Sequence, residues 1–164
     1  MKYEFTGEVK YIGRKILHRI RAVRDIPEYE IKSGDMGGWL ETEKNLSHDG
    51  SAWVTDSAVV MDAACVTGDA CVMDSARVTG KALVTDSADY IAIRAIGSRD
   101  DTTTFYRGKD GGIYVACGCF SGSIDDFAAK VKEVHAGTKH ERTYLLAIEL
   151  AKAQIGTTEE EDKC

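Results

Sequence analysis

The sequence predicts a mainly β protein whose centre is a parallel β-helix, and three observations support this fold class. Between Ser51 and Ser87, six-residue units follow one another without insertion: SAWVTD, SAVVMD, AACVTG, DACVMD, SARVTG and KALVTD. In each unit, an alanine and the valine two residues later fall on one face of an extended strand. The Asp or Gly that ends the unit favours a corner. A strand and a corner that repeat at a fixed interval indicate a chain wound into stacked turns.

The handedness and size of the predicted β-helix come from a resemblance. Six steps of about 100° do not keep a side chain on one face of an α-helix, so a helical repeat is rejected. The units resemble the hexapeptide-repeat family of left-handed β-helices, in which three units close one triangular turn. The resemblance implies that residues 46–93 form a short left-handed parallel β-helix of roughly 2.5 to 3 turns. Two open ends would then require caps.

Residues 1–45 are expected to form the N-terminal cap. The segments KYEFTGEVKYI and RKILHRIRAVRDI alternate apolar and polar residues on either side of Gly13, which predicts a β-hairpin. In the next segment, Asp35, Gly37 and Gly38 favour a tight turn. Trp39 offers a large apolar side chain that could close the first turn of the β-helix.

Residues 94–156 are expected to form a C-terminal cap of strands and two α-helices. The segments DYIAIRAI, TTTFYRGK and IYVACGCF predict strands, with a hairpin turn at 110–112. Ser123 with Asp126, and Thr138 with Glu141, have capping-box spacing and predict two helix starts. The acidic residues 157–164 predict a disordered tail.

The chain as a whole resembles a group of uncharacterised bacterial and phage-borne proteins with hexapeptide-repeat left-handed β-helices. Three blocks carry the resemblance: GDMGGWLETEKNLS, the Ala-x-Val units, and GSRDDTTTFYRGKDGGIYVACGCFSGSIDDF. The resemblance implies the same fold and a bacterial or phage origin. It implies no activity, cofactor or catalytic residue.

Composition narrows the classes of function. The net charge is −6, and such an acidic chain is poorly suited to bind a nucleic-acid backbone or an anionic membrane surface. The sequence has no signal peptide pattern and no membrane-spanning apolar run, so we expect a cytoplasmic protein. Its five cysteines are an odd number, which favours reduced thiols over a disulfide framework.

One enzymatic alternative depends on a single histidine in the repeat region. Many hexapeptide β-helices are acyltransferases that use a histidine as a general base between subunits. His48 is the candidate here, and a histidine in a solvated turn is the simpler interpretation.

A metal site is a second alternative, and a simpler interpretation of the same residues competes with it. Cys117 and Cys119 could bind zinc together with His135 or His140. A zinc site usually needs a further matched pair of ligands, which is missing. We therefore expect no metal or cofactor, with the two cysteines packed as small apolar residues beneath a helix.

The outward positions of the repeat carry more apolar residues than a solvated surface should. The expected apolar strip consists of Trp53, Val59, Cys71, Met73 and Leu83. Either the C-terminal helix of the same chain or a second protein should cover it. The leading hypothesis is a non-enzymatic protein-interaction module that self-associates as a dimer or trimer, with a host protein as its further candidate partner. The alternatives are the acyltransferase and a small-ligand binder.

Overall fold

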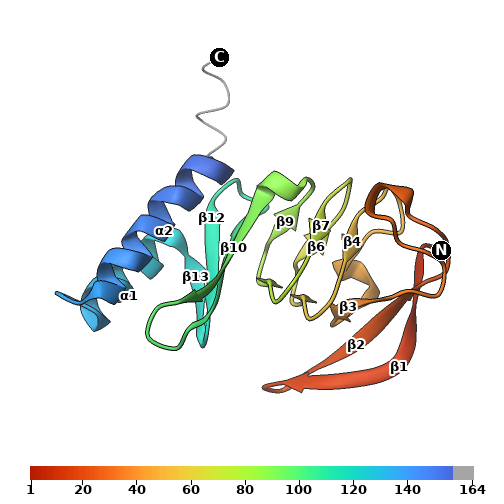
Figure 1. Cartoon of the computed structure of the whole chain (residues 1–164), viewed down its shortest axis with the longest axis horizontal. Coiled ribbons are helices and arrows are strands. Elements are labelled where there is room, and N and C mark those ends of the chain that lie inside the picture. The colour runs from red at the N-terminus through yellow and green to blue at the C-terminus, as the bar shows by residue number, and fades with distance from the viewer. Residues whose placement is uncertain (157–164) are drawn as a thin grey trace, which may run out of the picture. The chain divides into compact units, whose positions relative to one another are not determined.

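The computed structural model describes residues 1–156, which form two compact units, one of residues 1–87 and one that begins at Ala88. The expected division at residues 45, 93 and 156 stays a prediction, and the expected tail at 157–164 lies outside the described residues. Figure 1 shows the elements of each unit. The first unit consists of strands with short 3₁₀ helices, whereas both α-helices belong to the second unit.

An N-terminal hairpin begins the first unit, as the sequence predicts. Strand β1 (Tyr3–Ile12) pairs antiparallel with β2 (Lys15–Ala22), and a bulge interrupts their register between Phe5 and Val9. Strand β3 (Met36–Leu40) adds antiparallel to β2. Two short 3₁₀ helices, Pro27–Tyr29 and Glu43–Asn45, lie on either side of β3 in the chain.

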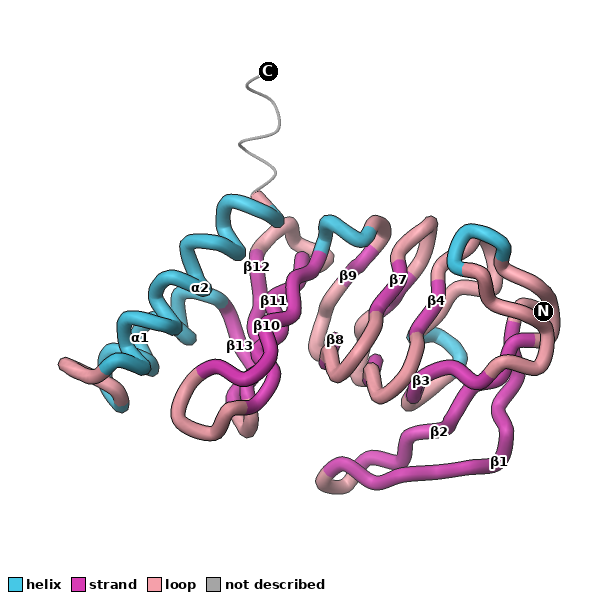
Figure 2. Tube along the Cα trace, viewed as in Figure 1, coloured by secondary structure: helices cyan, strands magenta, loops and turns pink. Residues whose placement is uncertain are grey.

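The repeat forms short parallel pairs between residues eighteen positions apart. Its two-residue strands are β4 (Trp53–Val54), β5 (Val59–Val60), β6 (Cys65–Val66), β7 (Cys71–Val72), β8 (Arg77–Val78) and β9 (Leu83–Val84). Strand β4 pairs with β7, β5 with β8 and β6 with β9. Figure 2 shows these strands as brief segments separated by loops. The alanine and valine of every unit are buried.

The predicted left-handed parallel β-helix is wrong, and so is the hexapeptide-repeat solenoid as the architecture. The structure is mainly β, with several small mixed and antiparallel sheets and two helices, and the repeat supplies only short parallel pairs. One physical reason is that corners take up much of each unit. Asp56, Asp62, Gly68, Asp74 and Gly80 adopt positive φ angles two residues after the ends of β4 to β8, so each of these five strands is limited to two residues. A second reason is that β5 and β8 join the antiparallel hairpin in one five-stranded mixed sheet, ordered β1-β2-β3-β5-β8.

Two glycines that were expected in a turn lie in strand β3 instead. A Cβ atom on Gly37 would lie 2.6 Å from Ile20 Cγ1 and 2.8 Å from Trp53 Cζ2. A Cβ on Gly38 would lie 2.7 Å from the carbonyl oxygen of Ala58. These glycines are therefore needed for the close approach of β3 to the repeat, and not for a turn.

The second unit is built on an antiparallel four-stranded sheet. Its strands, in sheet order, are β10 (Tyr90–Ile96), β11 (Asp101–Arg107), β12 (Ile113–Cys117) and β13 (Phe120–Ser123). A short 3₁₀ helix, Ser87–Asp89, precedes β10. The segment IYVACGCF was expected to be one strand, but a turn at Gly118 and Cys119 divides it into β12 and β13, with Cys117 opposite Phe120.

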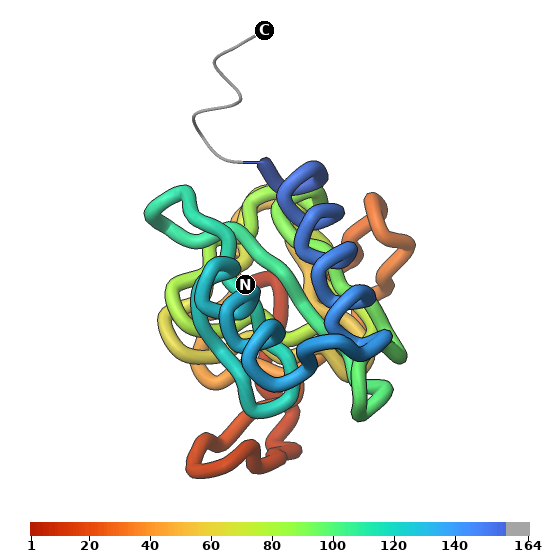
Figure 3. The backbone as a smooth tube through the Cα atoms, turned by 90° about the vertical axis from the view of Figure 1, so that its left-hand side faces the viewer, coloured from red at the N-terminus to blue at the C-terminus, as the bar shows by residue number. Residues whose placement is uncertain are grey.

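Two helices pack against this sheet, and both expected helix starts are confirmed. Helix α1 (Ile124–Val134) begins after Ser123, whose side chain accepts a hydrogen bond from the Asp126 amide. Helix α2 (Lys139–Ile155) begins after Thr138, which accepts one from the Glu141 amide. The helices lie side by side (Figure 3). Their buried residues share one core with β11 and β12.

Neither α1 nor α2, the α-helices of the described chain, is long and apolar enough to cross a membrane.

Candidate functional site

The most promising site is a pocket of about 190 Å³ within the second unit. It lies where the β12–β13 turn, the β10–β11 turn, α1 and the start of α2 come together. Its lining residues are Ser98, Arg99, Asp101, Cys117, Gly118, Cys119, Phe120, Phe127, Lys130, Val131, Val134, His135 and Tyr144. All belong to one unit, so the site does not depend on how the two units are arranged.

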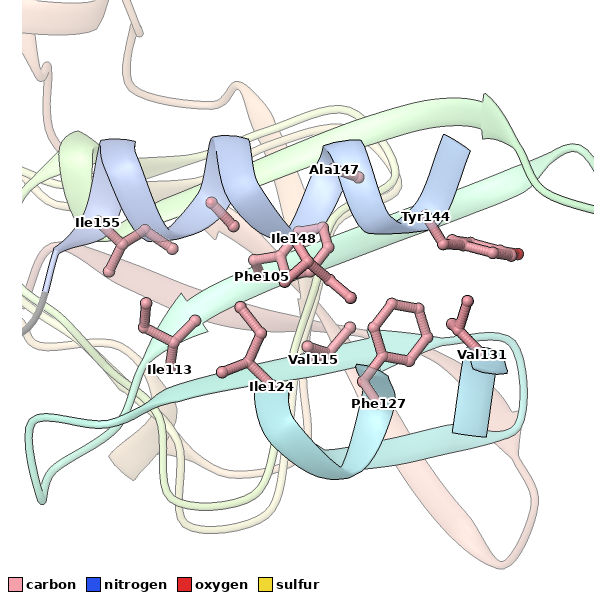
Figure 4. Close-up of a cluster of buried hydrophobic side chains, with 11 residues drawn as sticks. Phe105, Ile113, Val115, Ile124, Phe127, Val131, Tyr144, Ala147, Ile148 and Ile155 are labelled. Atoms are coloured by element: carbon pink, nitrogen blue, oxygen red, sulfur yellow. The ribbon is translucent and has the colours of Figure 1, made fainter. Parts of the chain in front are cut away.

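Aromatic rings form one wall of the pocket. The Phe127 ring lies 5.2 Å from the Phe120 ring and 5.4 Å from the Tyr144 ring, the second pair edge to face. Figure 4 shows Phe127, Val131 and Tyr144 together at one end of the buried cluster. His135 adds an imidazole ring 5.5 Å from Tyr144. This wall offers ring faces and edges for contact with a flat or apolar group.

Tyr144 is held by a close fit to Gly97. Gly97 lies in the β10–β11 turn with φ of +80°, and a Cβ there would lie 1.7 Å from the Tyr144 hydroxyl oxygen. Burial is the main cause that raises the pKa of Tyr144, and the neighbouring Cys117 and Asp101 raise it further, while Arg99 lowers it. The phenol therefore keeps its proton at neutral pH and can donate a hydrogen bond.

Cys117 and Cys119 occupy different environments. The half-buried Cys117 Sγ accepts a hydrogen bond from Thr103 Oγ1 at 3.3 Å and lies 3.7 Å from the Tyr144 hydroxyl. Cys119 is exposed in the β12–β13 turn. The expectation that both thiols pack beneath a helix thus does not describe Cys119. No group of three or more His, Cys, Asp or Glu suited to a metal ion occurs among residues 1–156.

Three exposed, charged side chains belong to the lining of the pocket. Arg99 and Lys130 carry positive charges, and Asp101 carries a negative one. Lys130 also contacts Glu133 one turn later on α1, at 3.5 Å, with both side chains exposed. An exposed pair of this kind is weak, so the lysine can turn towards a ligand at little cost.

His48, the candidate base of the acyltransferase hypothesis, contacts the N-terminal residues. Its ring stacks on Tyr3 with centroids 4.3 Å apart, and its Nδ1 accepts a hydrogen bond from the Lys2 amide at 3.1 Å. The Tyr3 hydroxyl in turn donates to the Leu46 carbonyl. His48 is therefore better placed to hold β1 against the segment before the repeat than to remove a proton from a substrate.

Most of the apolar strip expected on the outside of the repeat is covered within the first unit. Trp53, Val59 and Cys71 have exposed fractions of 1%, 3% and 4%. Val59 packs with Leu17 and Met61, with Ile12 and Trp39 against them. The cover over Val59 is therefore the N-terminal hairpin. Leu83 is half-buried, whereas Met73 is 45% exposed.

Sequence reasoning grouped Cys117, Cys119 and His135, which all line the pocket, but missed the other residues that shape it. Tyr144 fitted the buried stripe of a helix, and nothing local to it pointed to a pocket. Arg99 and Lys130 stand 31 positions apart in the sequence and form no motif. The nearest local signal was the set Cys117, Gly118, Cys119 and Phe120, which places thiols and an aromatic ring in one tight turn.

The sequence matches no protein-family model, and no curated protein is similar enough to count as a relative.

Proposed function

We propose that the second unit binds a small organic anion with a flat or apolar body in this pocket. The observation that carries the proposal is the combination of an aromatic wall with two cationic side chains, Arg99 and Lys130, at its mouth. The carboxylate of Asp101 lies in the same lining, so the two cations leave an excess of one positive charge there. In a chain with a net charge of −6, such a local excess would favour an anionic ligand over a cationic one.

The size of the pocket limits the ligand. Sites for drug-sized molecules usually measure about 300–1,000 Å³, and this pocket measures about 190 Å³. It therefore suits a molecule with one ring, or the end group of a longer one. The ring would contact Phe120 and Phe127, and the anionic group would lie near Arg99 and Lys130. The Tyr144 hydroxyl is a further hydrogen-bond donor on the same side.

Binding is a better account of the pocket than catalysis. A nucleophilic thiol needs a base that takes its proton. In the described chain, the hydrogen-bond contacts of Cys117 Sγ are the hydroxyl groups of Thr103 and Tyr144. Neither hydroxyl acts as a base at neutral pH, so Cys117 serves as part of the pocket wall.

The test compares three probes of one shape and different charge. Benzoate, benzyl alcohol and benzylamine are titrated separately into the full-length protein, and binding is followed by backbone amide NMR. We expect benzoate to shift the resonances of Gly118, Phe120 and Val131 and to bind most tightly. Equal binding of all three probes, or preferential binding of benzylamine, would contradict an anion site.

Matched variants test the role of the rim. We expect Arg99→Gln and Lys130→Gln each to weaken benzoate binding by about three- to tenfold, the effect of one solvent-exposed charge. Lys132→Gln is the control, because Lys132 is an exposed lysine on the same helix and does not line the pocket. A similar loss in all three variants would show that only net charge matters.

Protein interaction is the second candidate, and one observation favours it. The outer face of the β1–β2 hairpin exposes Val9, Tyr11 and Ile16 by 44%, 69% and 45%.

We further propose a cytoplasmic location. Among the described residues, the thiols of Cys65, Cys71, Cys117 and Cys119 form no disulfide, which fits a reducing compartment.

A further inference from the structure

The pocket of the second unit contains a charged group that a simple organic anion does not use. Asp101 belongs to the same lining as Arg99 and Lys130. A carboxylate ligand is attracted by the two cations and repelled by the Asp101 carboxylate. A ligand that also carried a positive group could use all three charges.

Strand β11 directs the Asp101 side chain to the face of the sheet that the helices cover. Alternate residues of a strand share one face, and Phe105 of β11 belongs to the core shared with α1 and α2. Thr103, two residues earlier, donates a hydrogen bond to Cys117 on this face. Asp101 is the next residue of the alternation, and it pairs with Ile96 of β10, which packs against the same core. The backbone of β11 therefore fixes the side of the sheet on which this carboxylate lies.

Arg99 and Asp101 bring opposite charges to the same part of the pocket. They are two residues apart where the β10–β11 turn enters β11. After burial and Cys117, the charge of Asp101 raises the pKa of Tyr144 and that of Arg99 lowers it, so both charges lie near this hydroxyl. Among residues 1–156, neither side chain forms an ion pair with an N–O distance of 4.0 Å or less. A ligand with one group of each sign can therefore pair with both.

Helix α1 places the second cation beside the apolar wall. Four residues of α1 line the pocket, and the last three stand three, four and seven positions after the first, so they share one side of the helix. They are Phe127, Lys130, Val131 and Val134. Figure 4 shows Phe127 and Val131 at the same end of the buried cluster as Tyr144. Lys130 lies about one turn from Phe127, so a ligand that contacts this ring has a cation within reach.

We propose, on the basis of the function proposed above, that the ligand is a free α-amino acid with an aromatic or large apolar side chain. Its carboxylate lies between Arg99 and Lys130, its ammonium group against Asp101, and its side chain against Phe120 and Phe127. One carbon atom carries both charges of an α-amino acid, so they require an acidic and a basic side chain close together. The β10–β11 turn supplies this pair. Each end of a peptide carries only one of the two charges and so matches the pocket less well.

The test compares three ligands that share a ring and a two-carbon chain but differ in charge. L-Phenylalanine carries both charges, 3-phenylpropanoate lacks the ammonium group, and 2-phenylethylamine lacks the carboxylate. Each is titrated into the full-length protein, and the Kd is obtained from the amide resonances of Gly118 and Phe120. We expect L-phenylalanine to bind about three- to tenfold more tightly than either of the others, the effect of one exposed charge pair.

A matched pair of variants tests the role of Asp101. Asp101→Asn removes the charge but keeps an oxygen that can accept the hydrogen bond from the Thr102 amide, 2.8 Å long in the native chain. We expect this variant to bind 3-phenylpropanoate more tightly than L-phenylalanine, because Arg99 and Lys130 then repel an ammonium group that has no partner. Asp100→Asn is the control, because Asp100 is the exposed neighbouring aspartate and does not line the pocket. It should keep the preference for L-phenylalanine.

The amino-acid ligand and the anion site would be contradicted by different results. Binding of benzoate and 3-phenylpropanoate with no gain for L-phenylalanine would overturn the amino-acid ligand and leave the anion site in place. An unchanged preference in Asp101→Asn, or an equal loss of preference in Asp100→Asn, would also overturn it. Failure of every probe to bind, benzoate included, would overturn both.

Discussion

Burial of single polar groups gives this chain several points at which pH and stability are coupled. Lys2 is the clearest case, since its side chain is fully buried beside Asp49 and its Nζ donates to the Asp49 carbonyl at 3.3 Å. Burial, with Arg24 as a second cause, lowers the pKa of Lys2 from 10.5 to about 8. The folded chain therefore holds this proton less tightly than the unfolded chain does.

The first prediction follows from the sign of that shift. Below pH 8 the Lys2 side chain is protonated in both the folded and the unfolded chain, so the full cost of burying its charge lowers the free energy of unfolding. Between pH 8 and 10.5 the unfolded chain binds more protons, so this contribution to the free energy of unfolding rises with pH. One pKa unit corresponds to about 1.4 kcal/mol, so the gain is at most roughly 3.5 kcal/mol. Urea unfolding across this pH range measures it.

The matched control for Lys2 is a methionine of similar length. Burial raises the pKa of Cys71 from 9.0 to about 11, which opposes the Lys2 effect above pH 9. The comparison of wild type with Lys2→Met cancels the Cys71 contribution. We expect the variant to be more stable at pH 7 by about 1–2 kcal/mol, with the advantage disappearing towards pH 10.5. An advantage that is independent of pH would contradict the assignment to Lys2.

A second residue-scale prediction concerns Gly97 in the β10–β11 turn. Gly97→Ala would combine a positive φ with a Cβ placed 1.7 Å from the Tyr144 hydroxyl. We expect a loss of about 2–4 kcal/mol of unfolding free energy, together with weaker benzoate binding, because Tyr144 must move. Gly137→Ala has a φ of +74° with no atom within 4 Å of the added Cβ, so it measures the backbone strain alone. Equal losses in the two variants would show that the contact with Tyr144 is unimportant.

At the scale of elements, alternation within a strand separates a buried from an exposed face of the hairpin. Leu17→Ala removes a fully buried side chain from the contact with Val59 and Met61. We expect it to lower the free energy of unfolding by about 2–5 kcal/mol. Ile16→Ala, one residue earlier and 45% exposed, should cost less than about 1 kcal/mol. Urea unfolding of both variants at low protein concentration is the measurement, and a larger loss for Ile16→Ala would reverse the assigned faces.

Local patterns predicted elements well where the decisive interactions are themselves local. The Ser123–Asp126 spacing marked the start of α1 because the cap is a hydrogen bond between those two residues. The break of IYVACGCF into β12 and β13 was missed. Val115, Cys117 and Cys119 alternate with smaller residues as on one face of a strand, and the turn is visible only in the pairing of Cys117 with Phe120.

At the scale of the whole molecule, the repeat was the main basis for the predicted fold class, and that prediction is wrong. The Ala and Val positions were correctly expected to be buried, but the sheet that β5 and β8 join is set by the rest of the chain. Gly37 and Gly38 allow β3 to approach the repeat closely enough for Trp39 to pair with Val59, which joins part of the repeat to an antiparallel hairpin. The pocket was equally hard to predict, because Gly97, Cys117 and Tyr144 meet only through the fold of the second unit.

Each unit has hydrophobic clusters of its own, so the two should unfold in distinguishable steps. The chain provides a separate signal for each. Both tryptophans, Trp39 and Trp53, belong to the first unit, whereas α1 and α2 belong to the second. Tryptophan fluorescence thus follows the first unit, and the helical circular dichroism signal follows the second.

The last prediction uses these two signals with one core variant in each unit. Ile148→Ala truncates a side chain that is 2% exposed in the α1–α2 core and should lower the helical midpoint, at a cost of about 2–5 kcal/mol. The tryptophan midpoint should stay in place, since no tryptophan belongs to that unit. Leu17→Ala should give the opposite pattern. If both signals moved together in both variants, the chain would unfold as one cooperative body, and ligand binding in the second unit would then also stabilise the first, by mass action.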